Sequence, residues 1–316
     1  MGETTNARLI NPAVILVATD LSDLHRIVPF AIQMAEKTGA RLELLHIPQF
    51  GGAFTVDAAG MPYYDREGAF SIAMNMLQPW CERARKLGLS CEPVVRQGHS
   101  AAQEIISAVR QLHADRLLLG TRSRSKLGKL LLGSVAEQVL RSASLPVFTI
   151  GPEAHLPSEN NDHLPTVLFA TSLGEGHHAG AALASKIAAS QHGKLIILHV
   201  LPPLVEKPGN RGINVLYTTI LHELRLLANT VGAESCHDAE VKVLYGNPPE
   251  QILVECTANR ADLIVMQTND HPNFHSVLHD RTICRVLTHA QCPVLTLNVP
   301  HAKAVEPETE ELAIHG

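Results

Sequence analysis

The stretch that decides the fold is Ile-Leu-Val-Ala-Thr-Asp at 15–20, which returns as Val-Leu-Phe-Ala-Thr-Ser at 167–172. Each is a short apolar run that ends in polar residues, as expected for a strand buried on both faces. Three further pairs repeat in the same order: LHIP at 45–48 with LHVLP at 198–202, ADRLLL at 114–119 with ADLIVM at 261–266, and PVFTI at 146–150 with PVLTL at 293–297. From Ala114 and Ala261 onward the two series keep a constant offset of 147 residues. Ordered matches of this kind indicate a duplicated unit.

The apolar runs alternate with longer amphipathic stretches, such as 101–112, which is the βαβα pattern of a parallel sheet. We expect strands at 13–19, 41–47, 90–96, 115–119 and 146–150 in the first half, and at 166–171, 194–200, 239–245, 262–266 and 293–299 in the second. The sequence therefore predicts an α/β fold of two tandem, doubly wound, parallel five-stranded sheets with helices on both faces, a Rossmann-like arrangement.

The domain boundaries follow from the repeat. We expect a first domain at 8–151, a second at 164–300, and a polar tail at 301–316, with a linker rich in Pro, Asn and acidic residues between the domains. The last strand of each domain would expose an apolar edge if it were left unpaired. We therefore predict that these two strands pair with each other and make an intramolecular pseudo-dimer. A further homodimer stays open.

Composition limits the classes of partner. The formal net charge of -5 argues against nucleic-acid binding, because such proteins present a basic face. The polar N-terminus has no apolar signal region and no apolar run is long enough to cross a bilayer, so we expect a cytoplasmic protein without membrane contact. The six cysteines contain no C-x-x-C pair, which favours free thiols in a reducing compartment: Cys81, Cys91, Cys236, Cys256, Cys284 and Cys292.

The loop after the fourth strand of the first half is the candidate anion site. It runs from Gly120 to Val135 and carries glycines, hydroxylated residues and four cations before an apparent helix at 135–140. Glycines let backbone amides approach an anion, and a helix N-terminus favours negative charge. The basic residues of this loop are Arg122, Arg124, Lys126 and Lys129. The loop contains no Walker A motif, and glycines and cations are also common in ordinary loops between strand and helix.

The combined motifs resemble the universal stress protein family. The loop is similar to that family's G-x2-G-x9-G-[ST] motif, with Gly120, Ser123, Gly133 and Ser134 at its four positions. The segment 18–22, Ala-Thr-Asp-Leu-Ser, resembles the T-D-x-S opening of the family. The resemblance covers essentially the whole chain as two copies, and it implies an adenine nucleotide alpha hydrolase-like fold.

For the ATP-binding branch of that family, the resemblance implies an adenine-nucleotide site in the first half, for ATP with or without Mg2+. Thr19 and Asp20 would flank the adenosine, the backbone at Ile47 would meet the adenine edge, and the amide of Gly133 would face phosphate. The implied cofactor-binding positions are Ala18, Thr19, Asp20, Ile47, Gly120, Thr121, Arg122, Ser123, Gly133, Ser134 and Val135. Ser123 departs from the motif, which has its second glycine at this position. Serine keeps the backbone amide and adds a hydroxyl, but it restricts the backbone.

The second half departs further from the motif. Its four motif positions are Gln267, Asp270, Asp280 and Arg281, and Ser172 replaces the aspartate of the first strand. Two carboxylates would stand where phosphate oxygens lie, and at ~4 Å and an effective dielectric of about 20 like charges repel by roughly 4 kcal/mol. We therefore expect one nucleotide per chain, held by the first half.

No metal site is assigned from the sequence. His271, His275 and His279 recur at a spacing of four that would suit zinc or copper on a helix, but Pro272 interrupts the run. A helical stripe of Met74, Met76, Leu77 and Trp80 is predicted to face the core.

No catalytic residue is assigned either, because the chain has no G-x-S-x-G elbow and no general base beyond Asp20. Three functions stay open. The first is a stress-response signalling protein in which bound ATP shapes a surface for a protein partner. The others are a slow ATPase or phosphotransferase, and an interaction protein that binds no nucleotide.

Overall fold

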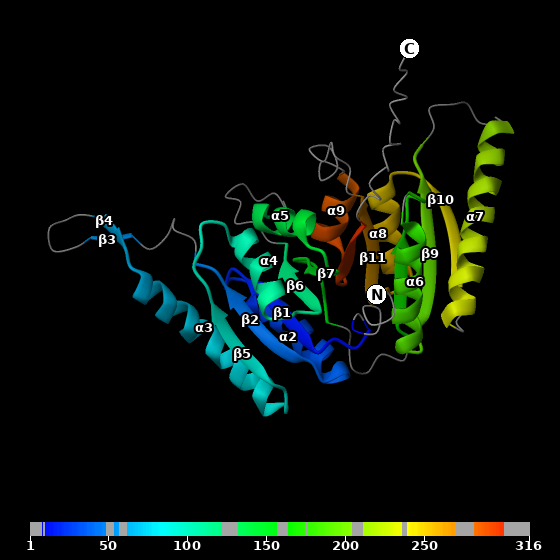
Figure 1. Cartoon of the computed structure of the whole chain (residues 1–316). Helices are drawn as coiled ribbons and strands as arrows, with labels where there is room; N and C mark the ends of the chain where they lie inside the picture. Colours follow the sequence, from blue (N-terminus) through cyan, green and yellow to red (C-terminus); the bar gives the residue numbers. More distant parts are fainter. Residues whose placement is uncertain are drawn as a thin grey trace, which may run out of the picture.

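The fold was analysed in a computed structural model of the whole chain (Figure 1). The structure describes residues 8, 10–48, 54–56, 62–121, 132–156, 164–174, 176–203, 211–235, 239–269 and 281–299. Several predicted features therefore lie outside the described residues: the middle of the basic loop with Arg122 and Ser123, the histidines at 271–279, and the tail at 301–316.

The first half folds as a doubly wound parallel unit. Its elements are β1 (Val14–Thr19), α2 (Leu24–Thr38), β2 (Arg41–His46), β3 (Phe54–Val56), β4 (Pro62–Tyr64), α3 (Arg66–Lys86), β5 (Cys91–Val95), α4 (Ala101–Gln111), β6 (Arg116–Gly120), α5 (Ser134–Ser142) and β7 (Val147–Ile150). The five main strands lie in the order β5-β2-β1-β6-β7 and are parallel. The short antiparallel pair β3–β4 was not predicted, and it stands apart at the tip of α3 (Figure 1).

The second half repeats this order without a described counterpart of the β3–β4 pair. Its elements are β8 (Thr166–Ala170), α6 (His177–Ser190), β9 (Lys194–Leu201), α7 (Arg211–Ser235), β10 (Ala239–Tyr245), α8 (Pro248–Ala258), β11 (Leu263–Asn269), α9 (Arg281–His289) and β12 (Val294–Val299). The strands lie in the order β10-β9-β8-β11-β12, and they are again parallel.

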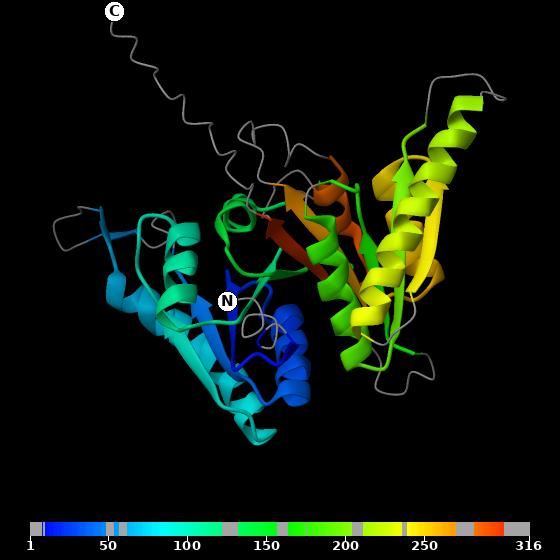
Figure 2. The same ribbon diagram turned by 45° about the vertical axis from the view of Figure 1, so that its right-hand side comes forward.

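The two halves join through their last strands, as the sequence predicted. β7 pairs antiparallel with β12, so a single ten-stranded sheet runs through the molecule (Figures 1 and 2). Two buried hydroxyls cross this junction: Thr149 donates to the carbonyl oxygen of Val294 at 3.1 Å, and Thr296 donates to that of Val147 at 3.3 Å. The apolar edge that each half would otherwise expose is thereby covered.

Helices cover the sheet on both faces, and side chains that alternate along the strands build one core layer on each side. Ile15 and Val17 point to the layer formed with α2, α3, α6 and α7, while Leu16 points to the layer formed with α4, α5, α8 and α9. One predicted stripe needs correction: Leu77 is fully buried under α3, but Met76 is 42% exposed. The helical period places these neighbours on different faces.

Candidate functional site

The winding of the first half defines where a ligand would bind. From β1 the chain continues to β2 and β5 on one side, whereas β6 and β7 lie on the other side. Ligands of doubly wound sheets bind outside the carboxyl ends of the strands at this reversal. The register sets Ala18 of β1 opposite Leu119 of β6, so Thr19 and Gly120 end neighbouring strands. The reversal point therefore coincides with the two segments that the sequence singled out.

The turn from β1 into α2 is fixed by side chains on the backbone. The hydroxyl of Thr19 accepts from the amide of Leu21 at 2.9 Å and donates to Oδ1 of Asp23 at 2.6 Å. Leu21 takes a positive φ of 73°, a conformation that is uncommon for a leucine. Asp20 is exposed, and its Oδ1 accepts from the amide and hydroxyl of Ser22 at 2.8 and 2.6 Å. The turn thus presents the Asp20 carboxylate at the rim.

The end of β2 is tied to the same turn. Nδ1 of His46 donates to the carbonyl oxygen of Thr19 at 2.9 Å, which leaves Nε2 of the neutral ring unprotonated. Burial lowers the pKa of His46, although the bond to Thr19 and the charge of Asp20 oppose that change. Ile47, expected beside the adenine, follows His46 and is buried. These bonds bring together the ends of β1 and β2.

Gly120 leaves room for a carboxyl group that sequence reasoning missed. A β-carbon at Gly120 would stand 2.0 Å from Oδ2 of Asp23 and 3.0 Å from Cδ1 of Ile27. Asp23 is 4% exposed, and burial raises its pKa above the ordinary value, with the hydrogen bond from Thr19 opposing the rise and Asp20 adding to it. The first glycine of the motif is therefore required by a protein side chain, whatever ligand binds nearby.

The N-terminus of α5 faces the same edge of the sheet. Gly133 caps α5 without a side-chain bond, and its φ and ψ of -65° and 141° are extended values that any residue adopts. The amide of Gly133 donates to the carbonyl oxygen of Thr121 at 3.2 Å, and its expected contact with phosphate stays a prediction. The amides of the first helical turn, at Ser134 and Val135, have no carbonyl partner within the helix. These two amides are further candidates for contact with an anion.

Thr121 adds a polar group to this edge. It is 1% exposed, and its hydroxyl has no hydrogen-bond partner among the described residues. In the second half the equivalent hydroxyl of Thr268 donates to the carbonyl oxygen of Leu297 at 3.2 Å. The orphaned hydroxyl is thus a feature of the first half. Of the eleven predicted positions, the structure describes nine at the ends of β1, β2 and β6 and the start of α5, and Arg122 and Ser123 lie outside the described residues.

The second half keeps the framework of the first site. The hydroxyl of Thr171 accepts from the amide of Leu173 at 3.0 Å, Leu173 has a φ of 59°, and Nδ1 of His199 donates to the carbonyl oxygen of Thr171 at 2.8 Å. Gln267 stands where Gly120 does, and its Nε2 donates to the carbonyl oxygen of Gly176 at 2.5 Å. An added β-carbon at Gly180 would lie 2.7 Å from Cδ of Gln267, so this side chain fills the space beside α6.

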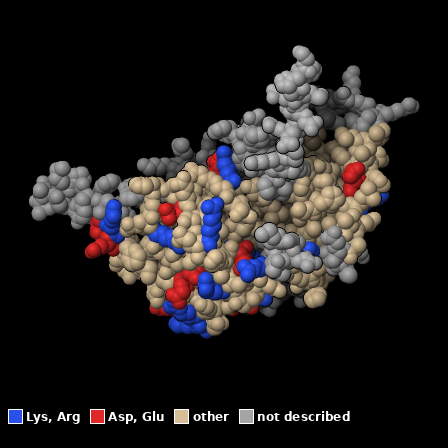
Figure 3. All heavy atoms as spheres, in the orientation of Figure 1, with Lys and Arg blue, Asp and Glu red and all other residues tan. Residues whose placement is uncertain are grey.

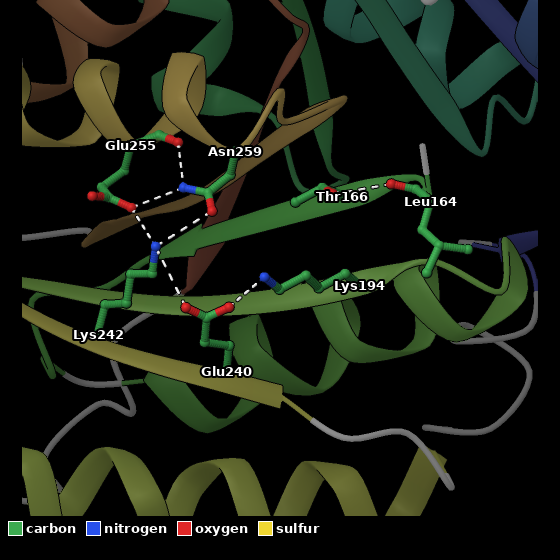
Figure 4. Close-up of polar contacts among 7 residues, drawn as sticks. All are labelled: Leu164, Thr166, Lys194, Glu240, Lys242, Glu255 and Asn259. Atoms are coloured by element: carbon green, nitrogen blue, oxygen red, sulfur yellow. Dashed lines mark hydrogen bonds and ion pairs between the residues drawn. The ribbon is translucent and has the colours of Figure 1, made fainter. Parts of the chain in front are cut away.

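The charged cluster of the second half lies at a different edge. Lys242 of β10 contacts Glu255 at 2.7 Å, Asn259 at 3.3 Å and Glu240 at 3.4 Å, and Glu240 also pairs with Lys194 (Figure 4). Burial alone would lower the pKa of Lys242, but the two carboxylates raise it above its usual range. The cluster ties β9 and β10 to α8, and its charged groups pair with one another. Charged side chains of this kind are typical of a protected sheet edge.

The described surface offers neither a membrane span nor a metal cluster. None of the described helices is long and apolar enough to cross a bilayer, and the described ranges contain no group of three or more potential metal-ligating side chains. On the face seen in Figure 3, basic and acidic side chains are interspersed, and most lie over the first half.

The fold and the candidate site together define a tandem α/β protein in which two pseudo-equivalent Rossmann-like units share one sheet and differ at the carboxyl ends of their strands. The model of the universal stress protein family matches residues 13–151 and 164–298, and the chain belongs to this family, with two of its domains in tandem.

Individual relatives agree with the two-domain reading. Universal stress protein YxiE of Bacillus subtilis is 25% identical over 143 residues, which cover 96% of that protein and 43% of this chain. A solved universal stress protein from Archaeoglobus fulgidus covers 90% of this chain and 96% of its own length with a TM-score of 0.67 at 20% identity. Protein PA1789 of Pseudomonas aeruginosa covers 93% and 94% with a TM-score of 0.61 at 20% identity. At these identities the structural matches support the fold.

Proposed function

We propose that this chain binds one adenine nucleotide, ATP, through its first half, and that it acts in the cytoplasm as a nucleotide-dependent stress-response or signalling protein. One observation supports the proposal: the end of β6 in the first half keeps the buried Asp23 carboxyl group beside Gly120 and a Thr121 hydroxyl without a partner among the described residues, whereas Gln267 and Thr268 of the second half are both hydrogen-bonded to the backbone. A solved universal stress protein is in complex with cAMP, which is a property of that protein. The proposal for this chain rests on its own residues.

Three groups of the first half suit the parts of a nucleotide. The Asp20 carboxylate at the rim is an acceptor for ribose hydroxyls, and the backbone at Ile47 offers polar groups to the edge of a base. The amides of Ser134 and Val135, together with the dipole of α5, favour phosphate. Arg122 and Arg124 would add positive charge, as the sequence predicts.

Gly133→Asp separates loss of binding from loss of fold. The extended conformation of Gly133 accepts aspartate, and aspartate is a better N-cap than glycine by a few tenths of a kcal/mol, so α5 should be retained or slightly stabilised. The new carboxylate would stand beside the phosphate, where roughly 4 kcal/mol of repulsion at ~4 Å corresponds to about a 1,000-fold loss of affinity. Gly133→Ser is the matched control, because it caps the helix without adding charge.

The experiment has two steps on the purified full-length protein. One sample is extracted with acid and chromatographed to identify any nucleotide that co-purifies, and a separate native sample is titrated with ATP by isothermal titration calorimetry. We expect one site per chain in the wild type, binding by Gly133→Ser, and none by Gly133→Asp at an unchanged melting temperature. Two equivalent sites, or full affinity in Gly133→Asp, would contradict the assignment to the first half. A stably folded wild type that binds no adenine nucleotide would contradict the function itself.

A further inference from the structure

Two cysteine sulfurs lie in direct contact in the core of the first half. Sγ of Cys91, the first residue of β5, lies 3.0 Å from Sγ of Cys81 on α3, and both residues are fully buried. A disulfide needs a sulfur–sulfur distance of about 2.05 Å, so the two atoms have to approach by only about 1 Å. The second half holds another buried pair, Cys256 and Cys292, with the sulfurs at 3.6 Å.

The backbone between Cys81 and Cys91 holds the pair in register. The amide of Gly88 donates to the carbonyl oxygen of Arg85 at 2.9 Å, and that of Leu89 donates to Ala84 at 3.1 Å, which closes the end of α3. Gly88 has a φ of 82°, where glycine is favoured. The amide of Leu42 donates to the carbonyl oxygen of Ser90 at 2.8 Å and pins the start of β5 to β2. The two thiols are therefore preorganised within a short connection.

The two sulfurs differ in their hydrogen bonding. The thiol of Cys91 donates to the sulfur of Cys81, and this bond, together with burial, raises the pKa of Cys91 far above its usual range. Arg85, one turn after Cys81 on α3, opposes that rise, and it forms an ion pair with Glu92 at 3.0 Å. Because Cys81 accepts this bond while Cys91 holds its proton between the two sulfurs, we assign the first attack to Cys81.

We propose that Cys81 and Cys91 form a modification site at which a hydroperoxide converts the two thiols into a reversible disulfide. The Cys81 thiol gives up its proton, its sulfur attacks one peroxide oxygen, and the O–O bond breaks, which gives a sulfenic acid. The leaving alkoxide or hydroxide takes up the proton from Cys81 and departs as an alcohol or as water. The Cys91 sulfur then attacks the Cys81 sulfur, the S–O bond breaks, and hydroxide leaves and takes up the Cys91 proton as water. Two thiols lose two electrons and two protons, and one peroxide is reduced.

The position of the pair at the edge of the molecule gives the oxidant a route. β5 is the terminal strand of the ten-stranded sheet, and α3 packs beside it at the outside of the first half (Figures 1 and 2). Pro93 in β5 lacks an amide for a further strand. Edge elements open locally at a lower free energy than the centre of a sheet, so buried thiols there become accessible by transient opening. Cys292 instead precedes β12 in the middle of the sheet.

The experiment maps the bond in the full-length protein. The protein is treated with hydrogen peroxide, remaining thiols are alkylated with iodoacetamide in denaturant, and the chain is digested with trypsin without reduction. Arg83, Arg85 and Lys86 lie between the two cysteines, so the disulfide would join the separate peptides 67–83 and 87–96. We expect this linked pair, lighter by two hydrogen atoms than the two free peptides and split by dithiothreitol, to accumulate several-fold faster than a link between Cys256 and Cys292.

The controls distinguish a disulfide from packing of two inert thiols. In Cys91→Ser the linked peptides should vanish, and dimedone should label Cys81 as a sulfenic acid. In Cys81→Ser no dimedone label should appear on Cys91. The peptide map of the wild-type protein tests the disulfide even if either variant fails to fold. If Cys81 and Cys91 remain alkylatable, or reach sulfonic acids unlinked, at peroxide doses that fully oxidise the partly exposed Cys284, the proposal is overturned.

Discussion

The contact between Gly120 and Asp23 predicts a compensating pair of substitutions. Gly120→Ala places a β-carbon 2.0 Å from Oδ2 of Asp23, so the carboxyl group has to leave its place. Moving it breaks the 2.6 Å bond from Thr19, and a hydrogen bond to a charged group is worth about 1.5–3 kcal/mol. Alanine also lowers the entropy of the unfolded chain, which returns about 0.4–1 kcal/mol. The net expected loss of stability is about 1–2 kcal/mol.

Asp23→Ala should remove most of that penalty. It loses the Thr19 bond by itself, but it removes the carboxyl group that the β-carbon at position 120 would displace and leaves only the flexible end of Ile27 at 3.0 Å. The Asp23 side chain makes no capping bond to α2. Gly120→Ala added to Asp23→Ala should therefore be neutral or slightly stabilising. The expected coupling free energy between the two sites is about 1–2 kcal/mol, well above the 0.3–0.5 kcal/mol scatter of independent sites.

Urea unfolding of the wild type, the two single variants and the double variant measures this coupling. Gly39→Ala is a useful comparison, because an added β-carbon there meets nothing within 4 Å and any loss reflects its φ of 71° alone. Additive effects of Gly120→Ala and Asp23→Ala would refute the reasoning. They would return Gly120 to the role that the sequence motif suggests, a glycine required by the ligand alone.

Three other perturbations test the fold and its charges. Gly151→Ala should lower the thermal midpoint, by a loss of about 1–3 kcal/mol, because the new β-carbon would lie 2.8 Å from the carbonyl oxygen of Leu287 in the other half. Burial raises the pKa of Asp23 in the folded protein, so the stability that its protonated form contributes is complete below about pH 3.8 and is lost as the pH rises through the higher folded value. Asp23→Asn has no such titration. Melting temperatures measured between pH 3 and 7 should therefore shift in favour of Asp23→Asn over the wild type as the pH rises. Lys242→Met should cost about 1–3 kcal/mol in urea unfolding, because Glu255 would keep its bond from Asn259 but lose its cation. Glu255→Gln should cost less, because the amide keeps a hydrogen-bond acceptor.

The sequence predicted the sheet well because its strands are apolar runs repeated in two copies. The predicted strand at 239–245 matches β10, and the pairing of the last strands is confirmed. The predicted strand at 262–266 stops three residues short of β11, since Gln267–Asn269 are polar but still pair with β12. Periodicity misses such residues because a partner strand, not hydrophobicity, keeps them extended.

The site was predicted less completely, for a different physical reason. Thr19, Asp20 and Gly120 belong to a linear motif and can be found by spacing, whereas Asp23 meets Gly120 across 97 positions of sequence. An acidic residue just before a helix has the pattern of an N-cap, which hides its actual contact with β6. Only the parallel pairing of β1 with β6 brings the two residues together. The missed contact is therefore one of tertiary structure.

The second half keeps the framework of the proposed site but differs from the first half at the end of β11. Thr171, Leu173 and His199 repeat the bonds of the first half, so the turn after β8 keeps its shape. The change is at the end of β11, where Gln267 fills the space that Gly120 leaves to Asp23 and satisfies its own amide on the backbone of Gly176. Because the filled end is hydrogen-bonded, it needs no ligand for stability. The first half instead retains a buried carboxyl with a raised pKa and an orphaned Thr121 hydroxyl, both of which cost free energy in a protein without a bound partner. That difference in satisfied polar groups is the physical reason why we propose a nucleotide site in the first half and not in the second.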